Sequence, residues 1–230
     1  MSAAATDPTV PATARRARLR GLYAVTPDVS DTARLAAMVL AAIEGGAIAI
    51  QYRNKSAAAA LRHAQAARLA SVCADHGALL IVNDDVALAR DVDADGVHLG
   101  EDDGDVAGAR AAVGDAKLVG VSCYNDFARA RRLVDEGADY IAFGSFFPSR
   151  VKPDARRADP ALLAHARGLG VPVVAIGGIT ADTAGTLAAA GADAVAVISA
   201  VFAHAGTDAV KRAAAAIAAR FDSPNRSATP

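Results

Sequence analysis

Short apolar runs alternate along the chain with longer stretches in which Ala, Leu and Arg recur at helical spacing. That spacing is typical of helices that bury one face, and the short runs between them are typical of strands. The predicted strands cover residues 21–26, 47–51, 79–82, 96–99, 118–121, 140–143, 171–176 and 194–198. The predicted helices cover residues 31–44, 56–76, 86–91, 105–113, 126–136, 159–167, 181–190 and 204–221.

The predicted strands show little alternation of polar and apolar residues, so both of their faces are expected to be buried. This is the pattern of a parallel sheet covered by helices. Gly-Ala dipeptides mark the ends of helices, because glycine adopts the left-handed conformation at little cost, and the similar phrases EGAD and AGAD indicate internal repetition. Eight βα units predict an α/β fold, a single (β/α)8 TIM barrel; a flavodoxin-like doubly wound sheet is the alternative.

The two ends of the chain lie outside this pattern. Residues 1–18 are rich in Ala, Thr, Pro and Arg and lack the apolar segment of a secretory signal, so they are predicted to form a disordered N-terminal tail. A mitochondrial presequence is an alternative, but Pro8 and Pro11 interrupt the amphipathic helix that it needs. We expect the catalytic barrel domain to span residues 19–221 and residues 222–230 to form a flexible C-terminal tail.

The net charge indicates which class of ligand the chain binds, and the cysteine content indicates its cellular compartment. Lys and Arg total 24 against 25 Asp and Glu, so the net charge of −1 provides no field that would gather nucleic acid or an anionic membrane. No run approaches the roughly 20 apolar residues of a membrane span. Cys73 and Cys123 are too few for a disulfide scaffold or a zinc site, which favours a cytoplasmic protein with reduced thiols that acts on small molecules.

Polar residues follow the predicted strands, where the catalytic groups of such barrels lie. After the second strand come Gln51, Tyr52, Arg53, Asn54 and Lys55. The planar fork of donors on arginine and the point charge of lysine together suit a diphosphate. A solvated loop with charged tips is the alternative interpretation of this segment.

Acidic residues follow the third and fourth predicted strands, in the phrases NDD and HLGEDD. Carboxylates at the ends of adjacent strands can converge on one hard cation, and Mg²⁺ takes one or two carboxylates with phosphates and waters. We therefore predict Asp84 and Asp103 as metal ligands. Asp85 and Asp102 are interpreted as helix-capping residues. His98 stays outside the catalytic set, because packing and hydrogen bonding explain it equally well.

The later strands are also followed by polar or glycine-rich segments. The segment after the sixth strand is interrupted by Gly and Pro and is expected to be a flexible substrate loop. Barrels frequently bind phosphate through the loops after their seventh and eighth strands, using backbone N–H groups that glycine leaves accessible. The candidates in these segments are Ser122, Ser149, Arg150, Val151, Lys152, Gly177, Gly178, Ile198 and Ser199.

Taken in order, the phrases LYAVTPD, QYRNK, NDD, DGVHLGEDD, GVS, FFPSRVKP, AIGGIT and AVAVISA resemble the thiamine-phosphate synthase family. The resemblance runs from about residue 22 to residue 200. It implies a (β/α)8-barrel transferase that joins a hydroxymethylpyrimidine diphosphate to a thiazole phosphate. In that reaction, which depends on Mg²⁺, pyrophosphate is released and thiamine phosphate is formed.

The resemblance also implies a role for individual residues. It assigns the pyrimidine diphosphate to Gln51, Arg53, Lys55 and Asn83, and the Mg²⁺ ion to Asp84 and Asp103. It assigns the diphosphate region to Ser122 and Lys152, and the thiazole phosphate to Ser149, Val151, Gly177, Gly178, Ile198 and Ser199. Arg53, Lys55, Ser122 and Lys152 are thereby expected to act in catalysis, with no protein nucleophile, by stabilising the departing pyrophosphate together with Mg²⁺.

The chain departs from the family pattern at two positions. Val151 stands where many members have the second threonine of PTxTK, so a hydroxyl donor is absent from that side chain. Glu101 stands where the family commonly has glutamine, which adds negative charge near the predicted metal site. Both departures concern substrate affinity more than the type of reaction.

Three other functions are compatible with the same fold. A paralogous thiazole tautomerase or regulator would not couple the two substrates, and it has no physical need for the cation and carboxylate set retained here. A phosphate-binding barrel without catalysis would bind ligands and form no product. A sugar-phosphate epimerase would need an acid–base pair across the mouth of the barrel in place of Arg53 and Lys55. The sequence leaves open a homo-oligomer and the exact form of the thiazole partner.

Overall fold

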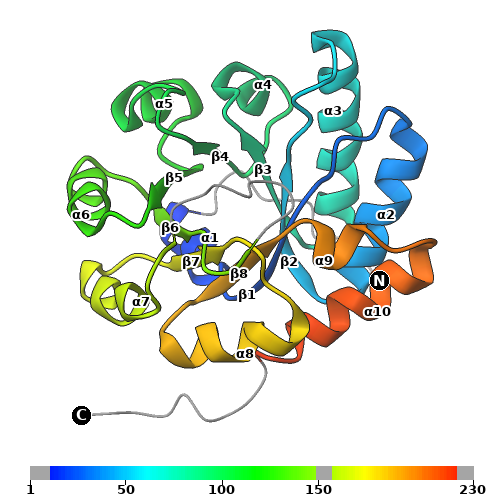
Figure 1. Ribbon diagram of the computed structural model, residues 1–230. Helices are drawn as coiled ribbons and strands as arrows, with labels where there is room; N and C mark the ends of the chain where they lie inside the picture. Colours follow the sequence, from blue (N-terminus) through cyan, green and yellow to red (C-terminus); the bar gives the residue numbers. More distant parts are fainter. Residues whose placement is uncertain (1–10, 149–156, 222–230) are drawn as a thin grey trace.

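The computed structural model describes residues 11–148 and 157–221. Within this part of the chain eight parallel strands close into a barrel in the order in which they occur in the sequence. A ring of helices surrounds the strands (Figure 1). The closed order confirms the predicted (β/α)8 barrel, because a doubly wound sheet would be open and would change direction in its strand order.

The observed elements agree closely with the predicted ones, apart from two additional short helices, α1 and α9. The strands are β1 (Gly21–Val25), β2 (Ala47–Tyr52), β3 (Leu79–Asn83), β4 (Gly96–Leu99), β5 (Leu118–Tyr124), β6 (Tyr140–Gly144), β7 (Val173–Ile176) and β8 (Ala194–Val197). The helices are α1 (Ala12–Ala17), α2 (Thr32–Glu44), α3 (Ala59–Asp75), α4 (Val86–Asp91), α5 (Val106–Val113), α6 (Phe127–Asp135), α7 (Ala161–Ala166), the 3-10 turn η1 (Arg167–Leu169), α8 (Ala181–Ala190), α9 (Ser199–Phe202) and α10 (Thr207–Ala218).

Aspartate side chains begin four of the helices. The side chains of Asp31, Asp85, Asp105 and Asp126 each accept a hydrogen bond from the backbone N–H three residues further on. A cap of this kind satisfies one of the donors that the first turn of a helix leaves unpaired. The capping interpretation is therefore confirmed for Asp85 and wrong for Asp102, because α5 is capped by Asp105.

Successive side chains of each strand point alternately into two apolar layers. One layer lies between the strands and the surrounding helices, and the other fills the interior of the barrel. The interior layer contains Tyr23 and Tyr140, both at most 1% exposed. Because side chains alternate with a period of two along a strand, Gln51, His98 and Ser122 share this inward direction, toward the carboxyl ends of their strands.

The repeated Ala-Asp phrase has a structural reason. Asp95, Asp139 and Asp193 stand directly before β4, β6 and β8 or at their entry, at the amino-terminal end of the barrel. Each carboxylate accepts the backbone N–H of the strand that precedes its own in the sequence, at 2.7–3.0 Å. The repeat therefore fixes the register between adjacent strands.

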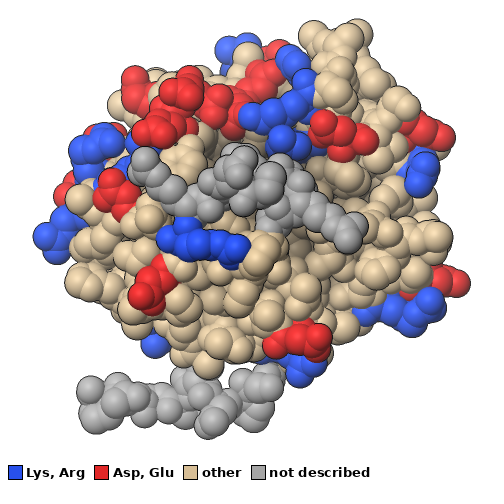
Figure 2. Space-filling view, in the orientation of Figure 1, with Lys and Arg blue, Asp and Glu red and all other residues tan. Residues whose placement is uncertain are grey.

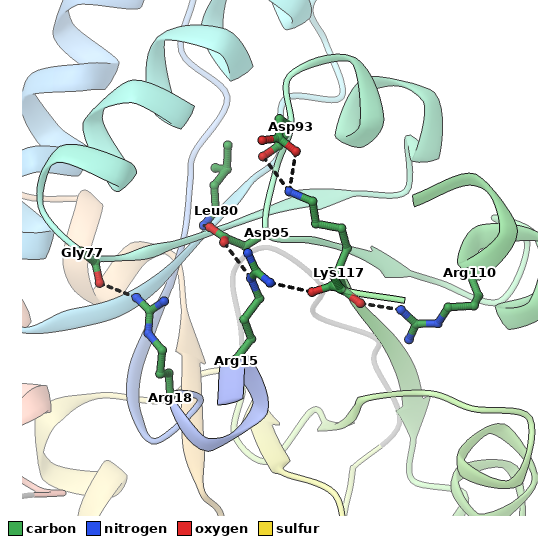
Figure 3. A network of polar contacts seen from close by, with 9 residues as sticks. Arg15, Arg18, Gly77, Leu80, Asp93, Asp95, Arg110 and Lys117 are labelled. Atoms are coloured by element: carbon green, nitrogen blue, oxygen red, sulfur yellow. Dashed lines mark hydrogen bonds and ion pairs between the residues drawn. The ribbon is translucent and has the colours of Figure 1, made fainter. Parts of the chain in front are cut away.

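The expectation of a disordered tail up to residue 18 is wrong for residues 11–18. Helix α1 packs against the amino-terminal end of the barrel, where Arg15 is 1% exposed and its Nε lies 3.1 Å from Asp95 Oδ1 (Figure 3). Arg16 pairs with Asp139, and Arg20 lies 4.0 Å from Asp193. The composition of this segment predicted that its arginines would be solvated. Instead, they form ion pairs with the aspartates at the entries of β4, β6 and β8. The predicted tails at 1–10 and 222–230 lie outside the described residues.

No helix in the described part of the chain is long and apolar enough to cross a membrane.

Candidate active site

The predicted site residues within the described part of the chain lie near or just after the carboxyl ends of β2, β3, β4, β5, β7 and β8, and therefore share one end of the barrel. Figure 2 shows acidic side chains gathered over the side of α4 and α5, with basic side chains beside them toward α3. Opposite charges thus adjoin one another around part of the barrel.

The segment after β2 carries the two predicted cations. The backbone N–H of Arg53 donates to the Thr26 hydroxyl, and that hydroxyl is also 2.9 Å from the Arg53 carbonyl oxygen. The Arg53 guanidinium lies 3.3 Å from Asp28, and Lys55 Nζ lies 3.1 Å from Asp84 Oδ2. The ends of β2 and β3 are therefore joined by an ion pair between two of the predicted site residues.

The two predicted metal ligands, Asp84 and Asp103, are both carboxylates and repel each other. Asp84 has a left-handed backbone with φ of 65°, and its N–H donates to the His98 carbonyl oxygen at 2.8 Å. Asp103 Oδ2 accepts the N–H of Gly100 at 2.9 Å. Desolvation raises the pKa of Asp103, and the nearby Asp84 carboxylate raises it further. A cation held between the two carboxylates would relieve this repulsion.

The number of carboxylates also bears on the kind of metal. Among the described residues no group of three or more His, Cys, Asp or Glu side chains is arranged to hold a metal ion. Two carboxylates are the usual protein contribution to a Mg²⁺ ion whose remaining positions go to phosphates and waters. Asp84 and Asp103 therefore fit Mg²⁺ better than a metal that needs a complete protein cage.

A chain of hydrogen bonds, buried except at its Ser122 end, crosses the interior of the barrel. Gln51 Nε2 donates to the Tyr23 hydroxyl at 2.9 Å, and the Tyr23 and Tyr140 hydroxyls are 3.0 Å apart. His98 Nδ1 lies 3.0 Å from the Tyr140 hydroxyl, and His98 Nε2 lies 2.9 Å from Ser122 Oγ. The chain links two predicted substrate-binding residues, one on β2 and one on β5, through three residues that were not predicted to belong to the site.

Burial keeps the middle of this chain uncharged. Desolvation raises the pKa of both tyrosines, Tyr23 and Tyr140, above the usual value of 10. Desolvation also lowers the pKa of His98 from 6.5 to about 4, against a smaller opposing effect of the Asp103 carboxylate. The placement of His98 outside the catalytic set agrees with its surroundings, since it is 8% exposed, stacks on Tyr140 and has both ring nitrogens in hydrogen bonds.

The lowered pKa of His98 predicts a specific dependence of stability on pH. Between pH 6.5 and 4 the unfolded chain binds a proton at this histidine that the folded chain does not, so stability falls as the pH is lowered. From pH 7 to pH 5 we expect His98 to account for a loss of roughly 2 kcal/mol in the free energy of unfolding. Urea unfolding at both pH values would measure it.

A matched pair of variants isolates this contribution. His98→Asn should show a smaller loss of stability between the two pH values than the parent chain. His63→Gln, at an exposed position on α3, should keep the loss of the parent. An equal pH dependence in His98→Asn and the parent chain would contradict the prediction.

The side chains of Tyr52 and Asn54, which were predicted to bind substrate, do not point into the site. The Tyr52 hydroxyl donates to Gln65 Oε1 on α3 at 2.9 Å. Asn54 Nδ2 donates to Gln65 Oε1 and to the Val29 carbonyl oxygen, both at 3.0 Å. Alternation along the strand explains the difference, because Gln51 faces the interior and Tyr52 must therefore face the helix layer. Parity alone does not tell which face of a strand is the interior, so it could not have identified Tyr23 or His98 from the sequence.

Glycines occupy the predicted phosphate site after β7. Gly177 and Gly178 have φ of 106° and 65°, which side chains rarely allow. A Cβ on Gly177 would lie 2.1 Å from Ser145 Oγ, and one on Gly178 would lie 2.3 Å from the Pro148 carbonyl oxygen. The two glycines therefore allow the segment after β7 to pack closely on the segment after β6.

The remaining predicted site residues that the structure describes, Asn83, Ile198 and Ser199, lie at this same end of the barrel. Asn83 ends β3 and pairs in register with His98, while Ile198 precedes α9 and Ser199 begins it. Ser149, Arg150, Val151 and Lys152 lie outside the described residues. The described site thus has a side with cations and carboxylates, after β2 to β5, and a glycine-lined side after β7 and β8.

A closed (β/α)8 barrel with cations, paired carboxylates and glycine turns at the carboxyl ends of its strands defines an enzyme of phosphorylated small molecules. The family model described as thiamine monophosphate synthase matches residues 22–201. The chain belongs to this family, which places it among the transferases of thiamine biosynthesis.

Individual relatives agree with this assignment. The chain is 55% identical to a thiamine-phosphate synthase of Methylobacillus flagellatus over 194 residues, covering 84% of this chain and 93% of the relative. It is 54% identical to a thiamine-phosphate synthase of Chromobacterium violaceum, covering 86% of this chain and 96% of the relative. Among solved structures, thiamine phosphate pyrophosphorylase from Pyrococcus furiosus is 33% identical with a TM-score of 0.78, covering 91% of this chain and all of that one.

Proposed function

We propose that the chain transfers the hydroxymethylpyrimidine group from its diphosphate to a thiazole phosphate, forming thiamine phosphate and releasing pyrophosphate. The observation that carries this proposal is that the Lys55–Asp84 ion pair and the neighbouring Asp103 lie at the same end of the barrel as the buried Gln51 and the half-buried Ser122. Cations suit the diphosphate, and the carboxylates suit a metal bound to it. A neutral heteroaromatic ring suits the less charged interior below.

Asp84 and Asp103 are the residues that would hold Mg²⁺. When bound, the ion supplies positive charge that neutralises the diphosphate oxygens as the leaving group departs. Asn83, at the end of β3, lies next to Asp84 and is proposed to contribute an amide to the same region. Glu101 is exposed, which leaves its charge in solvent.

The reaction breaks the C–O bond between the pyrimidine methylene and the diphosphate, and it forms a C–N bond to the thiazole nitrogen. Arg53, Lys55 and Lys152 are proposed to stabilise the charge that develops on the departing pyrophosphate, and Ser122 to donate a hydrogen bond to it. No protein nucleophile is needed. Burial raises the pKa of both described cysteine thiols, to about 12 for Cys123, so neither provides a thiolate.

The thiazole phosphate is proposed to bind on the glycine-lined side of the site. Gly177 and Gly178 leave backbone N–H groups accessible where any side chain would collide with the segment after β6. Ile198 and Ser199 adjoin them after β8, and the segment with Ser149, Arg150, Val151 and Lys152 is proposed to complete the site. The two substrates would then meet between the charged and glycine-lined sides.

An assay of pyrophosphate release with each substrate alone and with both together tests the proposal. We expect release, in the presence of Mg²⁺, that requires both substrates. Binding of either compound without release would favour a phosphate-binding barrel without catalysis. Conversion of the thiazole compound alone would favour a tautomerase, and epimerisation of a sugar phosphate would favour the third alternative.

Lys55→Ala is expected to lower turnover by about tenfold to a hundredfold, because one of the charges opposite the leaving group is lost. Its side chain is 59% exposed, so the free energy of unfolding should change by less than about 0.5 kcal/mol. Lys211→Ala is the matched control, since Lys211 on α10 is 50% exposed and pairs with Glu44. Steady-state rates of the two variants would be compared, and equal rates would argue against the assigned role.

The reaction is proposed to take place in the cytoplasm. Both described cysteines are free thiols, as a reducing compartment favours.

A further inference from the structure

We propose that Tyr23, Tyr140 and His98 are positioning residues. They orient the hydrogen-bond chain between Gln51 and Ser122 so that each group donates its proton to the next group toward Ser122. In this direction Gln51 presents an acceptor to the substrate and Ser122 presents a donor. The identity of the ligand rests on the proposed function, whereas the direction of the chain follows from the protein alone. None of these three residues was assigned a role by the sequence.

The direction is set at the Gln51 end. The side-chain nitrogen of Gln51 has no lone pair to offer, so the Tyr23 hydroxyl accepts its proton at 2.9 Å. Tyr23 has one hydroxyl proton, and it donates this proton to the Tyr140 oxygen at 3.0 Å. Tyr140 therefore has its own proton left for His98 Nδ1, which is 3.0 Å away.

The same reasoning fixes the tautomer of His98. An uncharged imidazole carries one N–H, and a nitrogen that accepts from Tyr140 cannot be the one that carries it. The proton of His98 is therefore on Nε2, which donates to Ser122 Oγ at 2.9 Å. The proton of the Ser122 hydroxyl stays free to point toward a bound substrate.

The two ends of the chain then differ in what they offer a ligand. Gln51 Oε1 has no hydrogen-bond partner among the described residues, so it can accept from an amino group. The free hydroxyl proton of Ser122 can donate to an anionic oxygen. An amino-substituted heteroaromatic ring that carries a diphosphate has both of these groups. The reverse direction would set the Ser122 lone pairs against the diphosphate.

Packing holds the middle of the chain in place. The Tyr140 ring stacks on His98 with 5.5 Å between centroids, and it meets the Tyr23 ring edge-on at 6.2 Å. A Cβ on Gly120 would lie 2.0 Å from the Tyr140 ring, so this glycine leaves the space that the ring occupies. Tyr140 is thus held between the two groups that its hydroxyl joins.

The first test measures the tautomer directly. Nitrogen-15 NMR of the full chain without substrate is expected to show His98 as the neutral Nε2–H form at pH 7. A neutral Nδ1–H form, or an imidazolium, would overturn the proposal. Because this experiment uses the unmodified chain without ligand, its result does not depend on the coupling reaction. If the unmodified chain releases no pyrophosphate, the proposed function fails while the tautomer result still decides the direction.

The second test removes one link. Tyr140→Phe deletes the donor to His98 Nδ1, so we expect a mixture of His98 tautomers. We also expect about a fivefold to tenfold higher KM for the pyrimidine diphosphate, with the KM for the thiazole phosphate unchanged. Tyr23→Phe, which breaks the chain one step earlier, should raise the same KM.

Tyr52→Phe is the matched control. It also deletes a buried tyrosine hydroxyl, but one on the outer face of β2 against α3 that makes a single hydrogen bond, whereas the Tyr140 and Tyr23 hydroxyls make two each. It should lower the thermal stability and change neither the His98 tautomer nor either KM. If Tyr140→Phe and Tyr23→Phe leave the KM for the pyrimidine diphosphate unchanged, or if Tyr52→Phe raises it equally, the positioning role is refuted.

Discussion

Replacement of Asp84 by asparagine is expected to reduce pyrophosphate release by at least about a hundredfold, which corresponds to roughly 3 kcal/mol in the activation barrier. The change removes one of the two facing carboxylates and the partner of Lys55, which lies 3.1 Å away. Asparagine is the right replacement because residue 84 has a left-handed backbone, with φ of 65°. Asn tolerates this conformation, whereas alanine would add backbone strain.

The neighbouring residue supplies the control for this prediction. Asp85→Asn makes the same chemical change one position away, and asparagine also caps helices well. Its activity should stay close to that of the parent chain. Steady-state rates over a range of Mg²⁺ concentrations would compare the two variants. Parent-like rates in Asp84→Asn, with no greater demand for Mg²⁺, would remove Asp84 from the metal site.

Gly177→Ala is expected to destabilise the chain by roughly 3–5 kcal/mol and to abolish most of the coupling activity. The φ of 106° is unfavourable for any L side chain. The added Cβ would also lie 2.1 Å from Ser145 Oγ and 2.7 Å from Ser145 Cα. Because part of this contact is with backbone, a change of rotamer cannot relieve it. The segments after β6 and β7 would have to move apart, and the backbone donors proposed for the thiazole phosphate would move with them.

A second glycine tests whether this effect belongs to the site. Gly168, in the 3-10 turn η1, has no atom within 4 Å of an added Cβ and no positive φ. Gly168→Ala should therefore leave stability within about 1 kcal/mol of the parent and leave activity unchanged. Urea unfolding and pyrophosphate release would be measured for both variants. Parent-like stability in Gly177→Ala would contradict the prediction, because it would show that the segment after β6 can move aside at little cost in free energy.

The predicted positions of the strands and of most site residues came from local physical rules. Buried parallel strands are continuous apolar runs, and polar residues directly after such a run lie at the mouth of a barrel. These rules place Gln51, Asp84 and Asp103 at one end of the molecule without any knowledge of long-range contacts. They fail for Tyr52 and Asn54, since adjacency in the sequence does not tell which face of the strand a side chain occupies.

Contacts between residues far apart in the sequence were beyond those rules. The composition of the first 18 residues predicts that Arg15 belongs to a solvated tail, but closure of the barrel brings Asp95 to it from 80 positions further along the chain. The tyrosines of the interior are equally inconspicuous, because an apolar run that contains a tyrosine reads as an ordinary strand. Closure of the barrel brings the Tyr23 and Tyr140 hydroxyls within 3.0 Å across 117 residues.

The sequence by itself therefore determined the barrel, the family resemblance and the charged rim, because hydrophobic periodicity and strand-end chemistry are local properties. Only the tertiary structure decided that α1 packs on the barrel and that Tyr52 faces outward. Only the tertiary structure joined Gln51 to Ser122 through three buried side chains. The physical reason is that a hydrogen bond depends on the distance and direction between two atoms, and closure of the strands in three dimensions fixes both.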